Sequence, residues 1–250
     1  MNNKLFDKNY VVLDGAMGTM LQQKGMELGT VPETLNITKS DWIVDIHKQY
    51  IEAGADVVYA NTFGANRYKM KDTGYTVDEL INAAIANAKE AAKGTDAMVA
   101  LDMGPIGQLL EPTGNLSFEE AYDIFKEEVV AAKDADIIVI ETMTDLLETK
   151  AAVLAAKENS NLPVITTMTF EENKRTFTGC SVSAMCLTLE GLGVDAMGVN
   201  CSLGPKDLIP IVEEISKWTS LPIVVKANAG LPDPVTNTYD VDADQFESIY

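Results

Sequence analysis

Polar side chains capable of chemistry directly follow most of the apolar, β-branched runs of this chain. They include acidic, amide, hydroxyl and thiol groups, which together can bind an ammonium group, a carboxylate or a metal ion. Any one of them alone is often only a turn or helix-capping residue. Because structural caps need not follow nearly every run, the repetition predicts a shared site. These residues are Asp14, Asn61, Thr62, Asp102, Glu141, Thr142, Asn200, Cys201 and Asn228.

Cys201 is the cysteine whose position suits metal binding. It lies between an apolar run that ends at residue 199 and a helix start at Pro205. A thiol there could lose its proton and bind a soft or borderline metal ion, and a structural cysteine is the alternative. Cys180 and Cys186 are six residues apart, which does not fit the short Cys-x-x-Cys spacing of metal sites. We predict that both are structural.

The single histidine, His47, is predicted to have a structural role. It lies among Ile43, Ile46 and Tyr50 at helical spacing, far from the end of any apolar run. We therefore expect it to pack or cap within a helix. A histidine-rich metal site is excluded, and a Ser-His-Asp triad would need this histidine in a place that does not suit it.

The apolar runs that position these residues alternate with helical patterns. Most runs are continuously apolar, as in strands buried on both faces of a parallel sheet. Thr76 with Glu79, and Ser117 with Glu120, have the spacing of capping boxes and predict two helix starts. The expected strands cover residues 11–13, 57–60, 98–101, 137–140, 164–167, 197–199 and 223–226. The expected helices lie around residues 43–51, 76–88, 117–129, 147–154, 183–192, 204–215 and 240–250.

This alternation predicts an α/β fold, either a closed (β/α)8 TIM barrel or an open doubly wound sheet. The chain has no Gly-x-Gly-x-x-Gly motif after its first strand and no Gly-Lys-Ser/Thr phosphate loop, which disfavours the nucleotide-binding open sheets. No linker divides residues 1–250, so we expect one barrel domain. Its eighth strand is missing from the sequence, so we expect a domain truncated at its C-terminal end and a polypeptide that continues past Tyr250.

The composition limits the possible partners and location. Of the 250 residues, 46% are hydrophobic and 23% are charged, as in globular proteins rather than disordered or fibrous ones. The net charge of −19 repels phosphate backbones and anionic lipids, so we expect neither nucleic acid nor a membrane as a partner. No apolar run reaches the ~18 residues of a membrane span, and the N-terminus lacks the apolar core of a signal peptide. We therefore expect a cytoplasmic protein whose cysteines stay reduced.

An ordered set of motifs resembles the homocysteine S-methyltransferase family. Residues 13–22, Leu-Asp-Gly-Ala-Met-Gly-Thr-Met-Leu-Gln, are similar to the opening of that domain, in the form found in the N-terminal module of cobalamin-dependent methionine synthases. The motifs that follow in the same order are residues 32–36, 47–56, 61–63, 104–105, 141–142 and 198–201. The resemblance covers essentially the whole chain and implies a (β/α)8 barrel.

The resemblance implies a binding site for homocysteine. Asp14 and Glu141 match carboxylates that hold the amino group of this substrate. Backbone amides of the glycine-rich turn that begins with Gly15 and Ala16 match the surroundings of the substrate carboxylate and thiol, with Thr62 nearby. Glycine in such a turn permits the close approach of a ligand to the backbone.

The resemblance also implies a catalytic zinc ion. Cys201 matches the first of three cysteine ligands, and Asn228 matches a residue that ligates zinc through its side-chain oxygen when substrate is absent. The other two ligands of the family form an adjacent pair in a Gly-Gly-Cys-Cys motif, which this sequence does not contain. Zinc lowers the pKa of a bound thiol, so the homocysteine sulfur would be a thiolate able to attack a methyl group at neutral pH.

The implied activity is transfer of a methyl group to the thiol of homocysteine, which gives methionine. The implied donor is methylcobalamin, recharged from methyltetrahydrofolate by downstream folate- and cobalamin-binding modules outside this chain. Related barrels use S-methylmethionine or betaine, and these donors are the first alternative. A non-catalytic barrel that lacks zinc is the second. We expect the 250 residues alone to have little activity, because they lack the cysteine pair.

Overall fold

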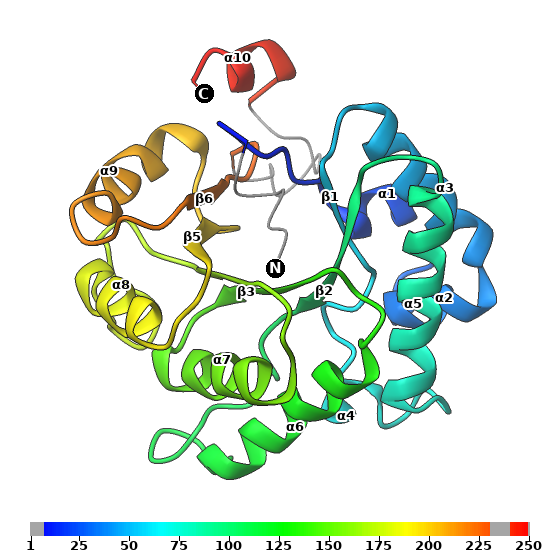
Figure 1. Cartoon of the computed structure of the whole chain (residues 1–250), viewed down its shortest axis with the longest axis horizontal. Coiled ribbons are helices and arrows are strands. Elements are labelled where there is room, and N and C mark those ends of the chain that lie inside the picture. The colour runs from blue at the N-terminus through cyan, green and yellow to red at the C-terminus, as the bar shows by residue number, and fades with distance from the viewer. Residues whose placement is uncertain (1–7, 231–240, 250) are drawn as a thin grey trace.

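The computed structural model describes residues 8–230 and 241–249. Its described part contains one parallel sheet in which the strands lie side by side in chain order. The sheet curls, and the helices lie on its outer side (Figure 1). The strands are β1 (Val57–Tyr59), β2 (Met98–Met103), β3 (Ile137–Met143), β4 (Val164–Met168), β5 (Ala196–Asn200) and β6 (Ile223–Lys226).

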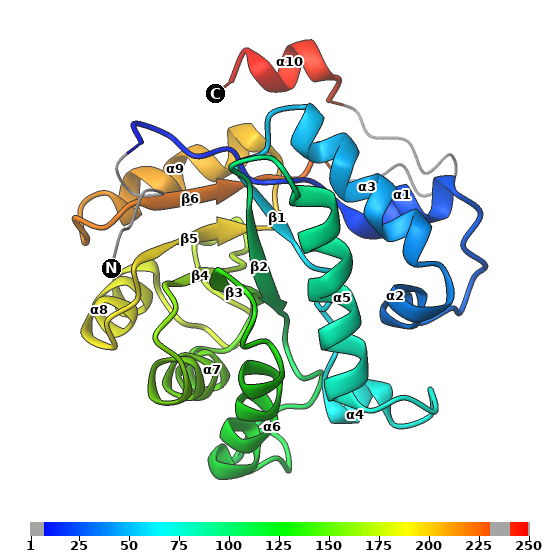
Figure 2. The same cartoon turned by 45° about the vertical axis from the view of Figure 1, so that its right-hand side comes forward.

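Helices follow the strands and cover the outside of the curled sheet (Figure 2). None of the helices in the described ranges is long and apolar enough to cross a membrane. The helices are α1 (Met17–Gln23), α2 (Leu35–Thr38), α3 (Ser40–Glu52), α4 (Arg67–Met70), α5 (Val77–Ala92), α6 (Phe118–Ala131), α7 (Leu146–Asn159), α8 (Val182–Gly191), α9 (Pro205–Ile215) and α10 (Ala243–Glu247), with a short 3₁₀ turn, η1 (Pro32–Thr34).

The first predicted strand, residues 11–13, extends the sheet beyond β1 as a single bridge. Leu13 pairs in parallel with Val57, and the N–H of Asp14 donates a hydrogen bond to the Val57 carbonyl at 3.1 Å. The chain therefore enters the sheet beside β1, and Asp14 follows at the end of the paired segment.

Burial on both faces of the sheet explains the continuously apolar runs. In β3, Ile137 and Val139 belong to a cluster that fills the inside of the curled sheet. Ile138 and Ile140 point the other way and pack under the helices. Alternate side chains of the strand are therefore buried on opposite faces of the sheet. This confirms the prediction of a parallel sheet covered by helices.

Both predicted capping boxes are present. Thr76 and Glu79 exchange hydrogen bonds at the start of α5, and Ser117 and Glu120 do so at the start of α6. Each pair satisfies N–H groups that the first turn of a helix leaves without partners. These local signals therefore fix where the two helices begin.

The glycine-rich segment at residues 15–19 differs from the prediction. It was expected as a turn, but α1 begins at Met17, so only Gly15 and Ala16 precede the helix. A helix of seven residues is too short to show an apolar period, and the same holds for the four-residue helices α2 and α4. The helix expected over residues 240–250 is present as the shorter α10, while residues 231–240 and 250 lie outside the described residues.

Candidate functional site

A lysine lies between two of the predicted carboxylates. Lys226 ends β6, Asp14 follows the bridge at Leu13, and Glu141 lies in β3. The Nζ atom of Lys226 is 3.6 Å from Oδ1 of Asp14 and 3.6 Å from Oε2 of Glu141. It also lies 3.8 Å from the centre of the Tyr59 ring, within the range of a cation–π contact. The curl of the sheet thus brings the segment at Leu13, the end of β6 and β3 together. We call this place, defined by Asp14, Tyr59, Glu141 and Lys226, the mouth.

Two carboxylate oxygens at this mouth lack a hydrogen-bond donor. Oδ1 of Asp14 and Oδ1 of Asp102 are buried and accept no hydrogen bond from the described residues. Lys226 is too far from Asp14, at 3.6 Å, to donate one. The other oxygen of Asp14 accepts a hydrogen bond from the Tyr59 N–H at 2.8 Å. Because buried acceptors rarely stay without a partner, the two oxygens mark a place for a ligand that carries N–H groups.

Burial sets the charge at this mouth. Burial raises the pKa of Asp14 to about 7, although Lys226 acts in the opposite direction. Burial and the neighbouring Glu141 carboxylate hold the pKa of Asp102 well above its usual range, which favours the neutral form of this carboxyl group. Burial alone would lower the pKa of Lys226, but the nearby carboxylates outweigh it and raise that pKa. Above pH 7 Asp14 is therefore mostly ionised, and its carboxylate lies beside the ammonium group of Lys226.

A buried amide fixes the backbone next to Glu141. Asn200 ends β5 and accepts hydrogen bonds from the Thr142 N–H and the Thr167 hydroxyl, both at 2.9 Å. Its own N–H group donates to the Thr142 hydroxyl at 2.8 Å. Thr142 has a φ of +62°, a left-handed conformation that is costly for a β-branched residue, at the point where the β3–β4 pairing shifts register. Asn200 therefore stabilises the strained backbone that carries Glu141.

Cys201, the residue after Asn200, has an exposed side chain and a φ of +55°. Its N–H donates to the carbonyl oxygen of Lys226 at 3.1 Å, which places it beside the end of β6. Partial desolvation and the Glu141 carboxylate raise the pKa of the Cys201 thiol, whereas Lys226 acts to lower it. The sulfur is therefore protonated at neutral pH unless a cation binds it.

The described residues do not complete a zinc site. Among them, no group of three His, Cys, Asp or Glu side chains is arranged to hold a metal ion. Cys180 precedes α8 and Cys186 lies within it, so they leave Cys201 without a second thiol. Asn228 follows β6, and its N–H donates to the Leu203 carbonyl at 3.2 Å. One thiol and one amide fall short of the three or four protein ligands that zinc takes in enzymes.

The remaining predicted substrate residues lie close to this mouth and make contacts within the protein. A Cβ atom at Gly15 would lie 2.8 Å from the Tyr50 hydroxyl oxygen, so a larger residue there would displace the Tyr50 ring. The same hydroxyl donates to the Ala16 carbonyl at 3.0 Å. Thr62 is buried, and its hydroxyl donates to the carbonyl and accepts from the N–H of Asp102, at 2.8 and 3.0 Å. Thr62 therefore joins the chain after β1 to β2 through backbone contacts.

His47 and Cys186 are packed in the interior, as predicted. Both ring nitrogens of His47 are buried without a hydrogen-bond partner in the described residues. Burial lowers the pKa of this histidine to about 4, so the ring is neutral. Cys186 is buried in α8, and burial raises the pKa of its thiol to about 11. Neither residue faces the carboxylates.

From the sequence, Asn200 is a candidate site residue, whereas Lys226 and Tyr59 have no predicted role in the site. Lys226 is the last residue of a predicted apolar strand, and a charged residue in such a run is itself a signal. Tyr59 is predicted only as a strand residue. Asn200 was noted at a strand end, but its partners Thr142 and Thr167 are far away in sequence. Only the curl of the sheet brings these residues together.

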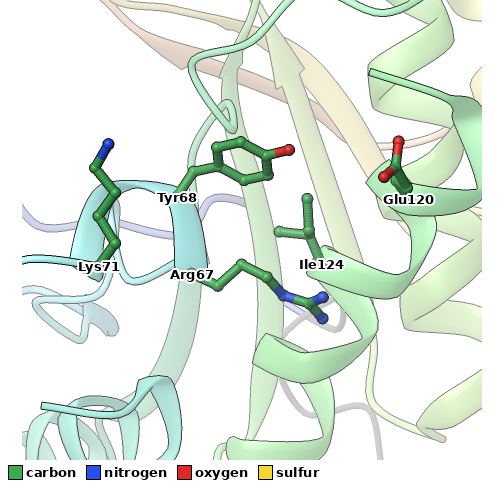
Figure 3. A pocket seen from close by; sticks show the side chains of 5 residues that line it. All are labelled: Arg67, Tyr68, Lys71, Glu120 and Ile124. Carbon is green, nitrogen blue, oxygen red and sulfur yellow. The ribbon is translucent and has the colours of Figure 1, made fainter. Parts of the chain in front are cut away.

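A separate hollow of about 330 Å³ lies between α4 and α6 (Figure 3). Arg67, one of two cations that line it, donates through Nε to the Glu127 carboxylate at 2.7 Å and through Nη2 to the Asp123 carbonyl at 3.2 Å. The guanidinium group of Arg67 is therefore already bound by groups of the protein. The residues that line it are Arg67, Tyr68, Lys71, Glu120 and Ile124.

Comparison with known proteins identifies the family. The homocysteine S-methyltransferase family matches residues 11–250, which is nearly the whole chain. The chain belongs to this family. The crystal structure of the metallated form of the homocysteine methyltransferase MmuM from Escherichia coli superposes with a TM-score of 0.83, at 22% identity over 99% of this chain and 91% of that one. This likeness confirms the predicted barrel fold.

The homocysteine S-methyltransferase domain also matches part of two longer relatives. The methionine synthases of Mycobacterium leprae and Mycobacterium tuberculosis are each 33% identical, over 244 and 248 residues. The matches cover 89% and 91% of this chain but 20% and 21% of the relatives. The chain thus spans about a fifth of the length of these relatives.

Proposed function

We propose that this homocysteine S-methyltransferase barrel binds homocysteine beside Asp14 and Glu141 and methylates its thiol to give methionine. The observation that carries the proposal is the pair of buried oxygens, on Asp14 and Asp102, that lack a hydrogen-bond donor. The ammonium group of an amino acid supplies three N–H donors and one positive charge, which this mouth can accept. The family membership makes homocysteine the amino acid to test first.

The residues around the mouth already hold the two carboxylates in place. The Tyr59 N–H orients Asp14, and the bonds between Asn200 and Thr142 fix the backbone next to Glu141. Neither carboxylate then needs to reorganise when the ammonium group binds, which favours affinity. An amino acid anchored there would extend its thiol within the same mouth that contains Cys201.

A zinc ion and its ligands Cys201 and Asn228 remain part of the proposal. The exposed thiol of Cys201 beside the end of β6 supports it, because zinc in enzymes takes cysteine sulfur as a ligand. A bound zinc would also lower the pKa of the substrate thiol. Because the described residues do not complete the coordination, we assign no step to the metal.

The proposed methyl donor is methylcobalamin, recharged from methyltetrahydrofolate by folate- and cobalamin-binding modules outside this chain, in the cytoplasm. The methionine synthases among the relatives support this choice. S-Methylmethionine or betaine is the second candidate, because the chain also resembles the homocysteine methyltransferase MmuM. Methylation assays of the full-length protein with each donor distinguish the two.

Calorimetric titration of the full-length protein tests the proposed substrate site. The ligands are homocysteine and 4-sulfanylbutanoate, which has the same thiol and carboxylate but no amino group. Glu141→Gln keeps the shape of the side chain and removes its charge. It should weaken homocysteine binding by about 1.5–3 kcal/mol, the scale of a charge-assisted hydrogen bond, and leave binding of the deamino ligand nearly unchanged. Equal affinity of the variant for homocysteine, with a lower melting temperature, would make Glu141 a purely structural residue.

A further inference from the structure

The ammonium group of Lys226 lies in the position proposed for the ammonium group of the substrate. Its Nζ atom is equally far, at 3.6 Å, from Asp14 and Glu141 and stacks on the Tyr59 ring. The two carboxylates are therefore already neutralised in part by a group of this chain. Any amino acid that binds them has to share or displace Lys226.

Two ammonium groups cannot share this mouth favourably unless another anion separates them. Like charges a few ångströms apart repel strongly where water is excluded, and Asp14 and Asp102 are both buried. Asp102 contributes no charge while it is protonated. A ligand that carries only a positive charge would therefore bind poorly beside Lys226.

A zwitterionic amino acid avoids the repulsion between two ammonium groups, because it also carries an anion. Its carboxylate is bonded to the same carbon as its ammonium group, so both groups enter the mouth together. That carboxylate would meet Asp14 and Glu141 and be repelled, unless a cation lies beside it. Lys226 is the cation that acts on Asp14, Asp102 and Cys201, so it is in place to do so.

The side chain of Lys226 can move its ammonium group over a short distance while its backbone stays fixed. The Lys226 carbonyl accepts the Cys201 N–H at 3.1 Å, and its backbone pairs with Asn200 in the sheet, so the backbone is fixed. The side chain is a flexible four-carbon stem whose end is held by ion pairs without a short hydrogen bond to either carboxylate. The ammonium group can therefore shift while the strand stays in place.

We propose that Lys226 determines specificity by binding the α-carboxylate of the substrate, after the substrate ammonium group has replaced it between Asp14 and Glu141. Lys226 thus neutralises the two carboxylates in the free protein and selects zwitterionic amino acids over simple amines. This inference rests on the proposed homocysteine site and adds Lys226 to the backbone amides at Gly15 and Ala16 that the resemblance implies for the substrate carboxylate.

The test compares homocysteine with 3-aminopropane-1-thiol, which has the same thiol and amino group but no carboxylate. Calorimetry of the full-length protein measures both affinities in the wild type, in Lys226→Met and in the charge-preserving control Lys226→Arg. We expect the wild type to prefer homocysteine by about tenfold or more, the scale of one charge-assisted contact. Lys226→Met should reduce this preference to about threefold or less, and Lys226→Arg should keep most of it.

The ratio of the two affinities separates specificity from damage to the fold. A general loss of structure lowers both affinities alike and leaves the ratio unchanged, and that result would overturn the role of Lys226 in carboxylate binding. Tighter homocysteine binding by Lys226→Met would also overturn it, because Lys226 would then only compete with the substrate. Failure of the wild type to bind homocysteine would instead refute the proposed function itself.

Discussion

Asp14 is close to its own titration midpoint at neutral pH, because burial raises its pKa to about 7. An ammonium ligand needs the ionised form, so homocysteine affinity should fall as the pH drops below 7, by about tenfold per unit where Asp14 is mostly protonated. Titrations of the full-length protein between about pH 5.5 and about pH 8 would measure this slope. Asp14→Asn should bind weakly throughout and lose the slope. A wild-type affinity that is flat over this range would contradict the role of Asp14.

Cys201 differs from the other cysteines in exposure and place. Its exposed thiol fills no core space, so Cys201→Ser should remove most of the bound zinc and the activity of the full-length protein while the melting temperature changes little. Serine oxygen is a much weaker zinc ligand than thiolate. Atomic emission would measure the metal content, and Cys180→Ser, before α8, is the matched control that should retain it. Unchanged zinc in Cys201→Ser would make this cysteine structural.

At the scale of elements, the ends of β3 and β5 depend on one amide. Asn200→Ala removes three hydrogen bonds and leaves the N–H of the strained Thr142 without its partner. Each buried group left unpaired costs about 1–3 kcal/mol, so we expect unfolding free energy to fall by about 2–4 kcal/mol and homocysteine affinity to fall with it. Urea denaturation and calorimetry measure the two effects. Asn82→Ala, on the exposed side of α5, is the control and should change neither.

The sequence reveals most elements because their signals are local. Strands buried on both faces need continuous apolar runs, and capping boxes at Thr76 and Ser117 place two helix starts within a few residues. The short helices α1 and α4 have no room for an apolar period, so they escape the same reasoning. The predicted carboxylates Asp14 and Glu141 lie at the mouth for a comparably local reason: each follows an apolar run. The position of Lys226 between them depends on the curl of the whole sheet, which no local pattern contains.

At the scale of the whole molecule, zinc retention depends on how many thiols reach the mouth. The 250 residues contain three cysteines and one histidine, and Cys186 and His47 are buried elsewhere. A purified polypeptide of these residues should therefore bind zinc weakly, because one thiolate and the Asn228 amide are a poor ligand set. Dialysis against a chelator followed by metal analysis would measure retention. Stoichiometric zinc that survives the chelator would contradict the prediction.

His47 should make the stability of the whole fold sensitive to acid. Burial lowers its pKa from 6.5 to about 4, so the unfolded chain takes up a proton in this range that the folded chain does not. Unfolding free energy should therefore fall as the pH drops through this window, by about 3 kcal/mol once it is crossed. Buried Glu128 and Glu148 act oppositely, because burial raises their pKa values and the folded state then binds the extra proton.

Comparison with His47→Leu isolates the histidine, since leucine fills the same apolar site and cannot titrate. Urea denaturation of both proteins at about pH 7.5 and about pH 5 measures the difference. The carboxyl groups contribute alike to both proteins and cancel. The wild type should lose about 2 kcal/mol more than the variant between these two pH values, because the unfolded histidine is then mostly protonated. An equal loss in both proteins would mean that His47 finds a proton-accepting partner in the folded state.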